Sequence, residues 1–114
     1  MTLETVYKRL KISPETLAKL CQENKIKELA VFGSILREDF NENSDIDLLV
    51  SYQPTAKRGL IQKIQMIETL KLLFNRDVDL VSKKAIENSH NWIRRQNILD
   101  SAEVIYAEGS RNFS

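Results

Sequence analysis

The chain has 114 residues, a length typical of a single domain, with 42% hydrophobic residues, 29% charged residues and a formal net charge of +1. This balanced charge gives no overall attraction to nucleic acids or membrane surfaces, so direct nucleic-acid binding is not expected. The chain contains one cysteine, Cys21, and one histidine, His90, which excludes an internal disulfide, a thiolate zinc site and a histidine-based triad.

The first part of the chain predicts two helices and a strand. A short apolar pattern is compatible with a helix over Leu3–Leu10. Ser13-Pro14-Glu15 is a stronger start signal, because serine caps a helix, proline fits its first position and acidic residues favour its first turn. The apolar run Leu29–Phe32 then predicts a buried strand, followed by a turn at Gly33-Ser34 and a short helical stretch over Ile35–Asp39.

The next part of the chain predicts a strand, a helix and a second strand. After a polar loop we expect a strand over Ile46–Tyr52. Apolar residues at threes and fours predict an amphipathic helix over Leu60–Phe74. The residues in that pattern are Leu60, Ile61, Ile64, Ile67, Leu70, Leu73 and Phe74. Val78–Val81 predicts the following strand, and a helix between two strands favours an α/β fold with those strands close together.

The last part of the chain predicts a helix, a strand and a tail. We expect a helix over Ala85–Leu99 that buries Ile86, Trp92, Ile93 and Leu99. Glu103–Ala107 predicts the final strand, and residues 109–114 are expected to form a frayed tail.

The Gly33-Ser34 pair predicts a phosphate site. Glycine allows a tight turn directly after the strand and a close approach of the backbone to a ligand. If a helical turn opens at Ser34, its free N–H groups and the serine hydroxyl face the same anion. Most Gly-Ser pairs after a strand are only turns, so this pair indicates a phosphate site only if the neighbouring residues also suit a phosphate ligand.

Three carboxylates predict a metal site beside that turn. Asp45 and Asp47 are two residues apart at the head of a strand, where such side chains emerge on one face. Like charges this close repel unless a divalent cation lies between them, and oxygen ligands on a strand suit Mg²⁺. Asp79, on the next strand, could lie opposite the pair, which would give the apparatus of two-metal phosphoryl or nucleotidyl transfer. Taken alone, each of the three could equally be a capping or solvent-facing carboxylate.

Three segments together resemble the signature of the DNA polymerase β-type nucleotidyltransferases. They are Gly33-Ser34 with Arg37, Ser44–Val50 with its two aspartates, and Val78–Val81. More narrowly, the chain is similar to the minimal nucleotidyltransferases, the small antitoxin partners of HEPN-domain toxins. This resemblance implies a small mixed β-sheet flanked by helices. It also implies Mg²⁺-dependent use of ATP, with two ions, and transfer of AMP to a tyrosine hydroxyl of the cognate HEPN ribonuclease.

The resemblance also assigns roles to individual residues. Gly33, Ser34 and Arg37 would bind the triphosphate, Asp45 and Asp47 would bind the metals, and Asp79 would be the third carboxylate. Many members of the family have glycine directly after the arginine, where this chain has Glu38. Arg37 could instead tie down the loop through Asp39.

We therefore expect one nucleotidyltransferase domain over residues 1–114, bound to its toxin in a hetero-oligomer. The expected location is the cytoplasm, because no apolar run reaches membrane-spanning length and the start of the chain lacks a secretory signal. Two rival interpretations stay open. The chain could act on a small hydroxylated molecule held by a separate subunit, or it could be a non-catalytic antitoxin that occludes its toxin by contact. Lys83, Lys84, Arg94 and Arg95 could form a basic patch, although such charges are usually the solvated face of a helix.

Overall fold

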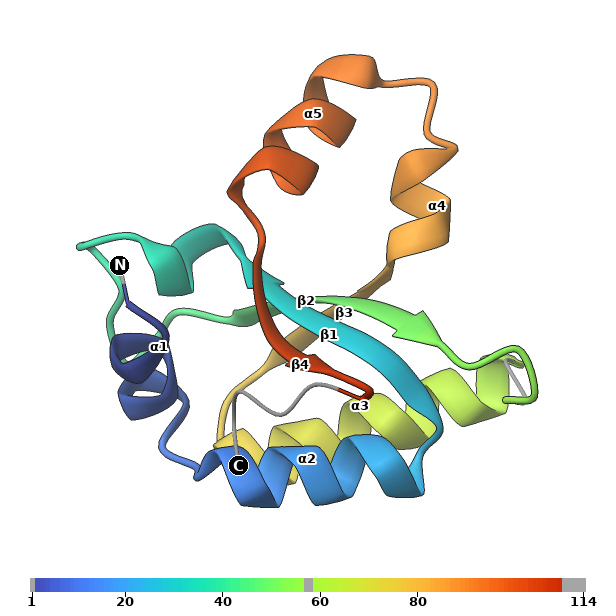
Figure 1. The fold of residues 1–114 in the computed structure, drawn as a ribbon. Helices are drawn as coiled ribbons and strands as arrows, with labels where there is room; N and C mark the ends of the chain where they lie inside the picture. Colours follow the sequence, from blue (N-terminus) through green and yellow to red (C-terminus); the bar gives the residue numbers. More distant parts are fainter. Residues whose placement is uncertain (1, 57–58, 110–114) are drawn as a thin grey trace.

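The computed structural model describes residues 2–56 and 59–109, and the predicted tail beyond Gly109 lies outside them. Within these residues, four strands form one mixed sheet in the order β3-β2-β1-β4 (Figure 1). β1 (Ile26–Phe32) pairs antiparallel with β2 (Ile46–Tyr52) and with β4 (Glu103–Ala107), whereas β2 pairs parallel with β3 (Val78–Ser82). The predicted α/β fold with a small mixed sheet is confirmed.

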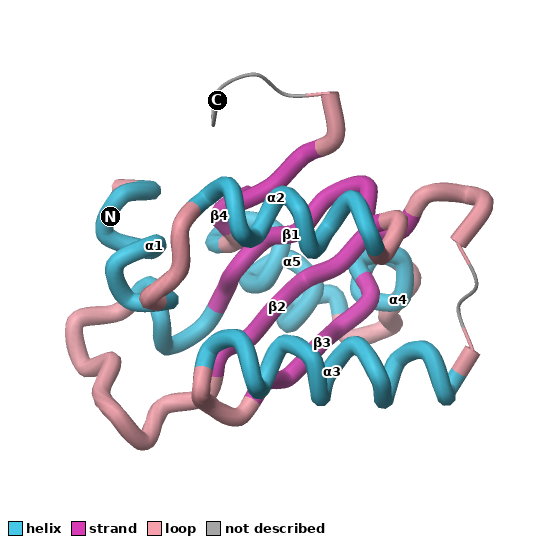
Figure 2. The backbone as a smooth tube through the Cα atoms, turned by 90° about the horizontal axis from the view of Figure 1, so that it is seen from below, coloured by secondary structure: helices cyan, strands magenta, loops and turns pink. Residues whose placement is uncertain are grey.

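Helices cover both faces of this sheet. α2 (Pro14–Glu23) and α3 (Leu60–Phe74) lie on one face, and α4 (Lys83–Glu87) and α5 (Trp92–Ser101) lie on the other (Figure 2). Each face therefore has its own apolar core, the larger one under α2 and α3 and the smaller one under α4 and α5. In the described part of the chain, no helix has the length and apolar character needed to span a membrane.

The predicted start of α2 at Ser13 is confirmed. The Ser13 hydroxyl accepts a hydrogen bond from the Thr16 N–H at 3.2 Å, and Pro14 occupies the first helical position. This cap satisfies one of the backbone donors that every helix leaves free at its start.

α3 has the predicted bounds, and its predicted apolar face is buried toward the C-terminal end, at Leu70 and Phe74, but not at the N-terminal end. Its buried side chains are Met66, Leu70 and Phe74, whereas Leu60 and Ile61 are 73% and 67% exposed. Figure 2 shows α3 diverging from β2 and β3 toward its N-terminal end. The first turns of α3 therefore lie away from the sheet, and apolar spacing alone could not predict this.

The helix predicted over Ala85–Leu99 is two helices, so that prediction was wrong. α4 ends at Glu87 and α5 begins after Asn91, whose Oδ1 accepts a hydrogen bond from the Arg94 N–H at 3.1 Å. Asparagine caps a helix more readily than it continues one, because its side chain competes for backbone hydrogen bonds.

The break also changes which side chains of α5 are buried. Ile86 of α4 is buried as predicted, but Trp92 and Ile93 are 64% and 56% exposed. Ile98 supplies the buried contact of α5 instead. The prediction that Trp92 and Ile93 are buried was wrong, because the cap at Asn91 starts a new helix with a new orientation.

The helical stretch predicted over Ile35–Asp39 is also displaced. A 3-10 helix, η1 (Gly33–Leu36), starts at the glycine itself, and Arg37 after it is extended, with φ −110° and ψ 160°. Arg9 donates hydrogen bonds to the carbonyl groups of Ile35 and Arg37, which a longer helix would use internally. The end of this turn is thus bonded to Arg9, a residue from a distant part of the chain.

α1 (Leu3–Leu10) is joined to the sheet by Tyr7. The Tyr7 hydroxyl donates a buried hydrogen bond to the carbonyl of Ile105 on β4. Burial, with smaller contributions from Cys21 and Glu15, raises the pKa of Tyr7 to about 12. This bond connects residues near the two ends of the described chain.

Replacing Tyr7 with phenylalanine should lower the free energy of unfolding by about 1 to 3 kcal/mol, because the Ile105 carbonyl loses its buried donor. Urea denaturation measures the change, with Tyr52→Phe on β2 as the control that removes a half-buried hydroxyl elsewhere. Because folding raises the Tyr7 pKa, the stabilisation is complete below about pH 10 and is lost as the pH rises toward 12. Equal stability of Tyr7→Phe and the parent would show that this bond contributes nothing.

Candidate active site

The register of the sheet sets two of the three predicted carboxylates, Asp47 and Asp79, in one row. Phe32 of β1 is paired with Asp47 of β2, and Asp47 is paired with Asp79 of β3. Paired residues share a face of a sheet, and Phe32 packs in the core under α4 and α5. The row therefore lies on the α4–α5 face. Asp45 is exposed and lies two residues before Asp47, just before β2 begins.

The Gly33-Ser34 turn packs directly on this row. Gly33 has φ +74°, and a Cβ at this position would lie 2.2 Å from Oδ2 of Asp47. The Ser34 N–H donates a hydrogen bond to the Asp47 carboxylate, and Ser34 Oγ donates one to the Asp45 carbonyl at 3.2 Å. The predicted phosphate turn and the predicted metal-binding carboxylates thus form one structural unit.

The electrostatics of the row favour a cation. Burial raises the pKa of Asp47, and the negative charges of Asp79 and then Asp45 raise it further. The Ser34 N–H and the Arg37 guanidinium act in the opposite direction. A carboxyl with this balance is stabilised in its ionised form when a positive ion enters.

The chemistry of the donors fits Mg²⁺, which prefers oxygen ligands and commonly takes only one or two carboxylates beside substrate phosphates. Asp45 and Asp47 supply such oxygens, and the Asp47 carboxylate lies against Gly33, where any side chain would displace it. Across residues 2–56 and 59–109, no three His, Cys, Asp or Glu side chains stand close enough together to hold one ion, so the structure does not bring Asp45, Asp47 and Asp79 together as the ligands of a single ion.

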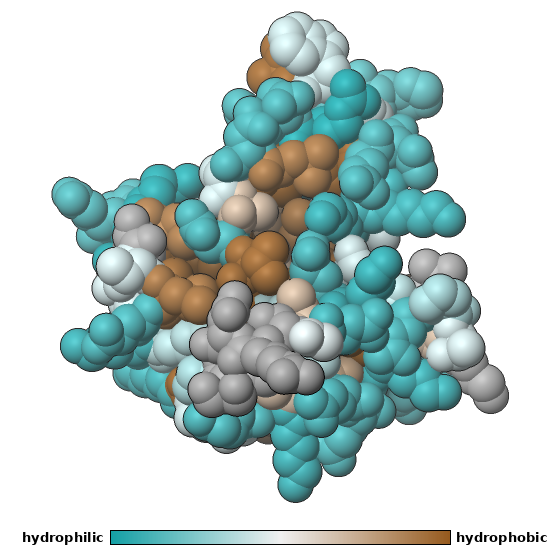
Figure 3. Space-filling model, viewed as in Figure 1, coloured by the Kyte–Doolittle hydropathy of each residue, from teal (hydrophilic) through white to brown (hydrophobic). Residues whose placement is uncertain are grey.

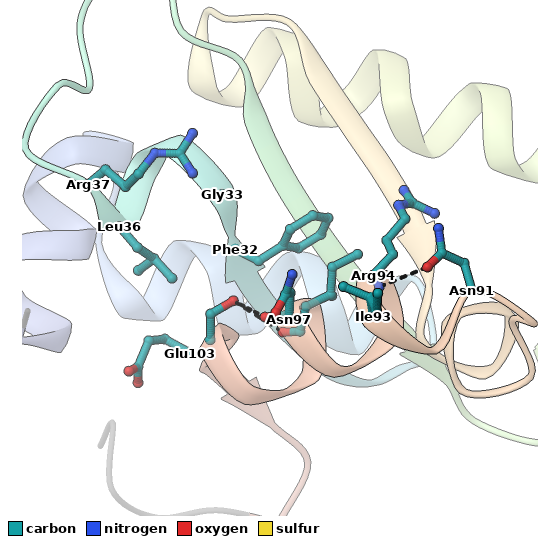
Figure 4. A pocket seen from close by; sticks show the side chains of 11 residues that line it. Phe32, Gly33, Leu36, Arg37, Asn91, Ile93, Arg94, Asn97 and Glu103 are labelled. Carbon is teal, nitrogen blue, oxygen red and sulfur yellow. Dashed lines mark hydrogen bonds between the residues drawn. The ribbon is translucent and has the colours of Figure 1, made fainter.

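An open pocket of about 880 Å³ lies between the Gly33 turn and α5. Figure 4 shows Arg37 on one side of it and Arg94 on the other, with Phe32 between them and Asn97 on α5. The face seen in Figure 3 carries apolar surface beside α5, surrounded by polar side chains. The volume is in the range of small-molecule sites, and apolar walls with a few polar groups and arginines suit a nucleotide.

Arg37 lies where either of its two predicted roles is possible. Its Nε is 3.7 Å from Oδ1 of Asp39, but both side chains are exposed, so this ion pair contributes little stability. Arg37 also lines the pocket and lowers the pKa of Asp47, so its charge reaches the site. Glu38 is not among the residues with positive φ, and the chain therefore needs no glycine at this position.

The contribution of α5 to the pocket was missed from the sequence. Asn91, Arg94, Asn97 and Ser101 all line it, and they recur at intervals of three or four residues. This spacing places polar side chains along one side of a helix and could have indicated a second wall of the site. The sequence indicates Arg94 and Arg95 only as part of a basic patch. In the structure Arg94 lines the pocket, whereas Arg95 donates to the Ser89 carbonyl at 2.9 Å.

Residues 14–105 match the family described as nucleotidyltransferase domain. A Methanocaldococcus jannaschii chain with the provisional name protein adenylyltransferase MJ1379 is 35% identical over 66 residues, which cover 58% of this chain and 66% of that one. Protein adenylyltransferase MntA of Thermococcus cleftensis is 35% identical over 63 residues, covering 55% and 62%. Each match spans just under two thirds of the relative's own length.

Solved structures share the fold. A toxin-antitoxin crystal structure with AMP-PNP superposes with a TM-score of 0.64 at 21% identity, covering 86% of this chain and 76% of that one. A tri-AMPylated Shewanella oneidensis HEPN toxin in complex with MNT antitoxin includes a chain that superposes with 0.57 at 19% identity, covering 86% and 72%. A structure provisionally named minimal nucleotidyltransferase superposes with 0.63 at 30% identity, covering 90% and 95%. The chain belongs to the nucleotidyltransferase domain family.

Proposed function

We propose that this chain transfers AMP from ATP to a tyrosine hydroxyl of a cognate HEPN-domain toxin, and so acts as an antitoxin. The observation that carries the proposal is the unit formed by the Gly33-Ser34 turn and the row of Asp47 and Asp79. The protein adenylyltransferase names of two relatives, and the toxin–antitoxin complexes among the structural neighbours, support the acceptor and the partner. We further propose that the whole domain works in the cytoplasm, where ATP is available.

The proposed substrate position follows from the turn and the pocket. The Gly33-Ser34 turn and Arg37 would hold the triphosphate beside the carboxylates. The Arg37 guanidinium is exposed, whereas the Ser34 N–H and hydroxyl donate to the Asp47 carboxylate and the Asp45 carbonyl in this structure and would turn to the phosphates when ATP binds. The rest of the nucleotide would occupy the pocket under α5, with Asn97 and Arg94 on its wall. Asp45 and Asp47 would hold Mg²⁺, with Asp79 as the third carboxylate of a site for two ions.

The proposed reaction is an in-line displacement at the α-phosphorus of ATP. A bond forms between the tyrosine oxygen and the α-phosphorus, and the bond from that phosphorus to the bridging oxygen breaks, releasing pyrophosphate. Asp79 would accept the proton of the attacking hydroxyl. The bound Mg²⁺ would neutralise charge on the departing pyrophosphate and lower the pKa of the hydroxyl.

The test of the function is incubation with the cognate HEPN protein, ATP and Mg²⁺, followed by intact mass measurement. We expect the HEPN protein to gain mass in steps of one adenylyl unit, and replacement of its acceptor tyrosine by phenylalanine should abolish the gain. Unmodified HEPN protein, with transfer instead to a small hydroxylated molecule, would favour the rival transferase. Full neutralisation of the toxin without any mass gain would favour occlusion.

ATP binding should depend on a divalent cation, because Asp45, Asp47 and Asp79 repel the triphosphate when no cation is present. Calorimetric titration of ATP in Mg²⁺ should give an affinity at least about tenfold higher than in excess chelator, which corresponds to about 1.4 kcal/mol. The measurement needs no toxin and no turnover. Equal affinities in the two conditions would contradict the metal assignment.

A further inference from the structure

Two arginines from distant parts of the chain meet at Phe40, in the loop of residues 37–45 between η1 and β2. The guanidinium carbon of Arg9 lies 5.4 Å from the centroid of the Phe40 ring, and that of Arg76 lies 4.3 Å from it. Both cations lie over the ring, which is the geometry of a cation–π contact. Arg9 belongs to α1 and Arg76 follows α3, so Phe40 ties the 37–45 loop to two separate elements.

Arg9 also holds the start of this loop. Its Nη1 donates hydrogen bonds to the Ile35 carbonyl at 2.7 Å and to the Arg37 carbonyl at 2.5 Å. Arg37 is the residue of this loop that lines the nucleotide pocket. The backbone that carries Arg37 is thus bonded to α1.

Arg76 holds the other end of the loop. Its Nη1 donates hydrogen bonds to the Asn41 carbonyl at 2.7 Å and to the Ser44 carbonyl at 2.8 Å. Ser44 directly precedes Asp45, and its carbonyl belongs to the peptide group that joins the two residues. Arg76 therefore donates to the peptide group that joins Ser44 to Asp45.

We infer that Arg9, Phe40 and Arg76 form a clamp on the 37–45 loop, and that Arg76 is a positioning residue for Asp45. This inference rests on the function proposed above. Asp45 is exposed and precedes β2. The peptide group that follows Asp45 is held by the Ser34 hydroxyl, which donates to the Asp45 carbonyl at 3.2 Å, and by the Asp77 carbonyl, which accepts from the Ile46 N–H at 3.0 Å. Arg76 supplies the matching hold on the peptide group that precedes Asp45. The planar guanidinium can bond two carbonyls and stack on a ring at the same time, which a lysine cannot do.

The position of Asp45 matters because displacement of a reacting group by about 1 Å can reduce the rate of a positioned reaction by about a hundredfold. The clamp acts through the backbone, and none of Arg9, Phe40 and Arg76 lines the nucleotide pocket. Its loss should therefore affect turnover and metal affinity more than the KM for ATP, since the Gly33-Ser34 turn stays in place.

The test compares Arg76→Met with Arg76→Lys and with the control Arg95→Met. Arg95 is also a half-buried arginine that bonds a backbone carbonyl, but that carbonyl is Ser89, outside the 37–45 loop. Arg76→Met should lower kcat about tenfold or more and weaken Mn²⁺ binding, measured by calorimetry, while the KM for ATP, measured at saturating Mg²⁺, changes little. Arg76→Lys should restore part of both, and Arg95→Met should change neither.

Hydrogen exchange of the amides of Asn41 and Ser44 tests the clamp without any reaction. These N–H groups donate to the Ser44 hydroxyl and to the Asn41 carbonyl, both at 3.1 Å. Exchange there should be about tenfold faster in Arg76→Met than in the parent, with the amide of Leu48 in β2 unchanged.

Each outcome decides between the clamp and its alternatives. Parent-like exchange and turnover in Arg76→Met would overturn the inference. Faster exchange with unchanged turnover and Mn²⁺ affinity would also overturn it, because Arg76 would then stabilise the loop without positioning Asp45. A parent protein that transfers no AMP would contradict the proposed function instead, and exchange and Mn²⁺ affinity would still decide whether the clamp positions Asp45.

Discussion

Replacement of both Asp45 and Asp47 by asparagine should abolish AMP transfer while the protein stays folded and bound to its HEPN partner. Asparagine keeps the size of the side chain but removes the two charges that would hold the metal. Loss of metal stabilisation at a transferring phosphoryl group costs several kcal/mol, and each 1.36 kcal/mol is about tenfold in rate, so turnover should fall about a thousandfold or more. Intact mass measurement of the HEPN protein reports the loss directly.

The fold should tolerate this change. Burial, Asp79 and Asp45 all raise the pKa of Asp47, which means that its negative charge is disfavoured in the folded protein. An asparagine oxygen can still accept the hydrogen bond from the Ser34 N–H. We therefore expect a thermal midpoint equal to or slightly above that of the parent.

The matched control removes two charges elsewhere, through Glu4→Gln on α1 and Asp100→Asn on α5, both exposed positions. This control should transfer AMP at the parent rate. If the Asp45→Asn, Asp47→Asn variant protects cells as completely as the parent does, the toxin is neutralised by occlusion. The non-catalytic interpretation would then be correct.

Strand and helix bounds were predictable where the local pattern was long or capped. Ile46–Tyr52, Leu60–Phe74 and Glu103–Ala107 match the structure, and Ser13 caps α2 as expected. β1 begins at Ile26, three residues before the predicted start. The prediction began too late because the charged residues Lys27 and Glu28 interrupt the apolar run in the sequence. Apolar periodicity predicts only the part of a strand whose side chains are apolar, so charged residues at the end of a strand are missed.

The elements that were predicted wrongly depend on contacts between distant residues. Apolar spacing in α3 predicts a helix but not how far the sheet extends beneath it, so the pattern includes Leu60 and Ile61 although both are exposed. The exposed Trp92 follows from the cap at Asn91, which competes with continuation of a single helix. Side-chain capping outweighed helix propensity over these few residues.

The candidate site divides in the same way. The βαβ connection predicts that the strands of Asp47 and Asp79 are neighbours, and the register places these two residues opposite each other. The clamp on the 37–45 loop could not be predicted, since Arg9, Phe40 and Arg76 share no motif and meet only through the fold. Side chains that carry chemistry leave a local signature, whereas those that support them do not.

Replacement of Gly33 by alanine should remove activity without unfolding the protein. The new Cβ would lie 2.2 Å from Oδ2 of Asp47 and 3.1 Å from its Cγ, so the carboxylate must move. Rotation of this side-chain end is possible, and the fold should lose only about 1 to 2 kcal/mol for an alanine at positive φ. The displaced carboxylate no longer holds the metal beside the phosphates, and turnover should fall about a hundredfold or more.

Gly109 provides a control with almost the same φ angle. Its φ is +75°, against +74° at Gly33, but a Cβ there would meet no atom within 4 Å in the described structure. Gly109→Ala should therefore carry the same backbone cost and keep its activity, measured by the same mass assay and by thermal unfolding. If Gly33→Ala transfers AMP as fast as Gly109→Ala does, the position of the Asp47 carboxylate beside the turn is not what the reaction needs. If both variants lose activity equally, loss of stability and not displacement of Asp47 is the cause.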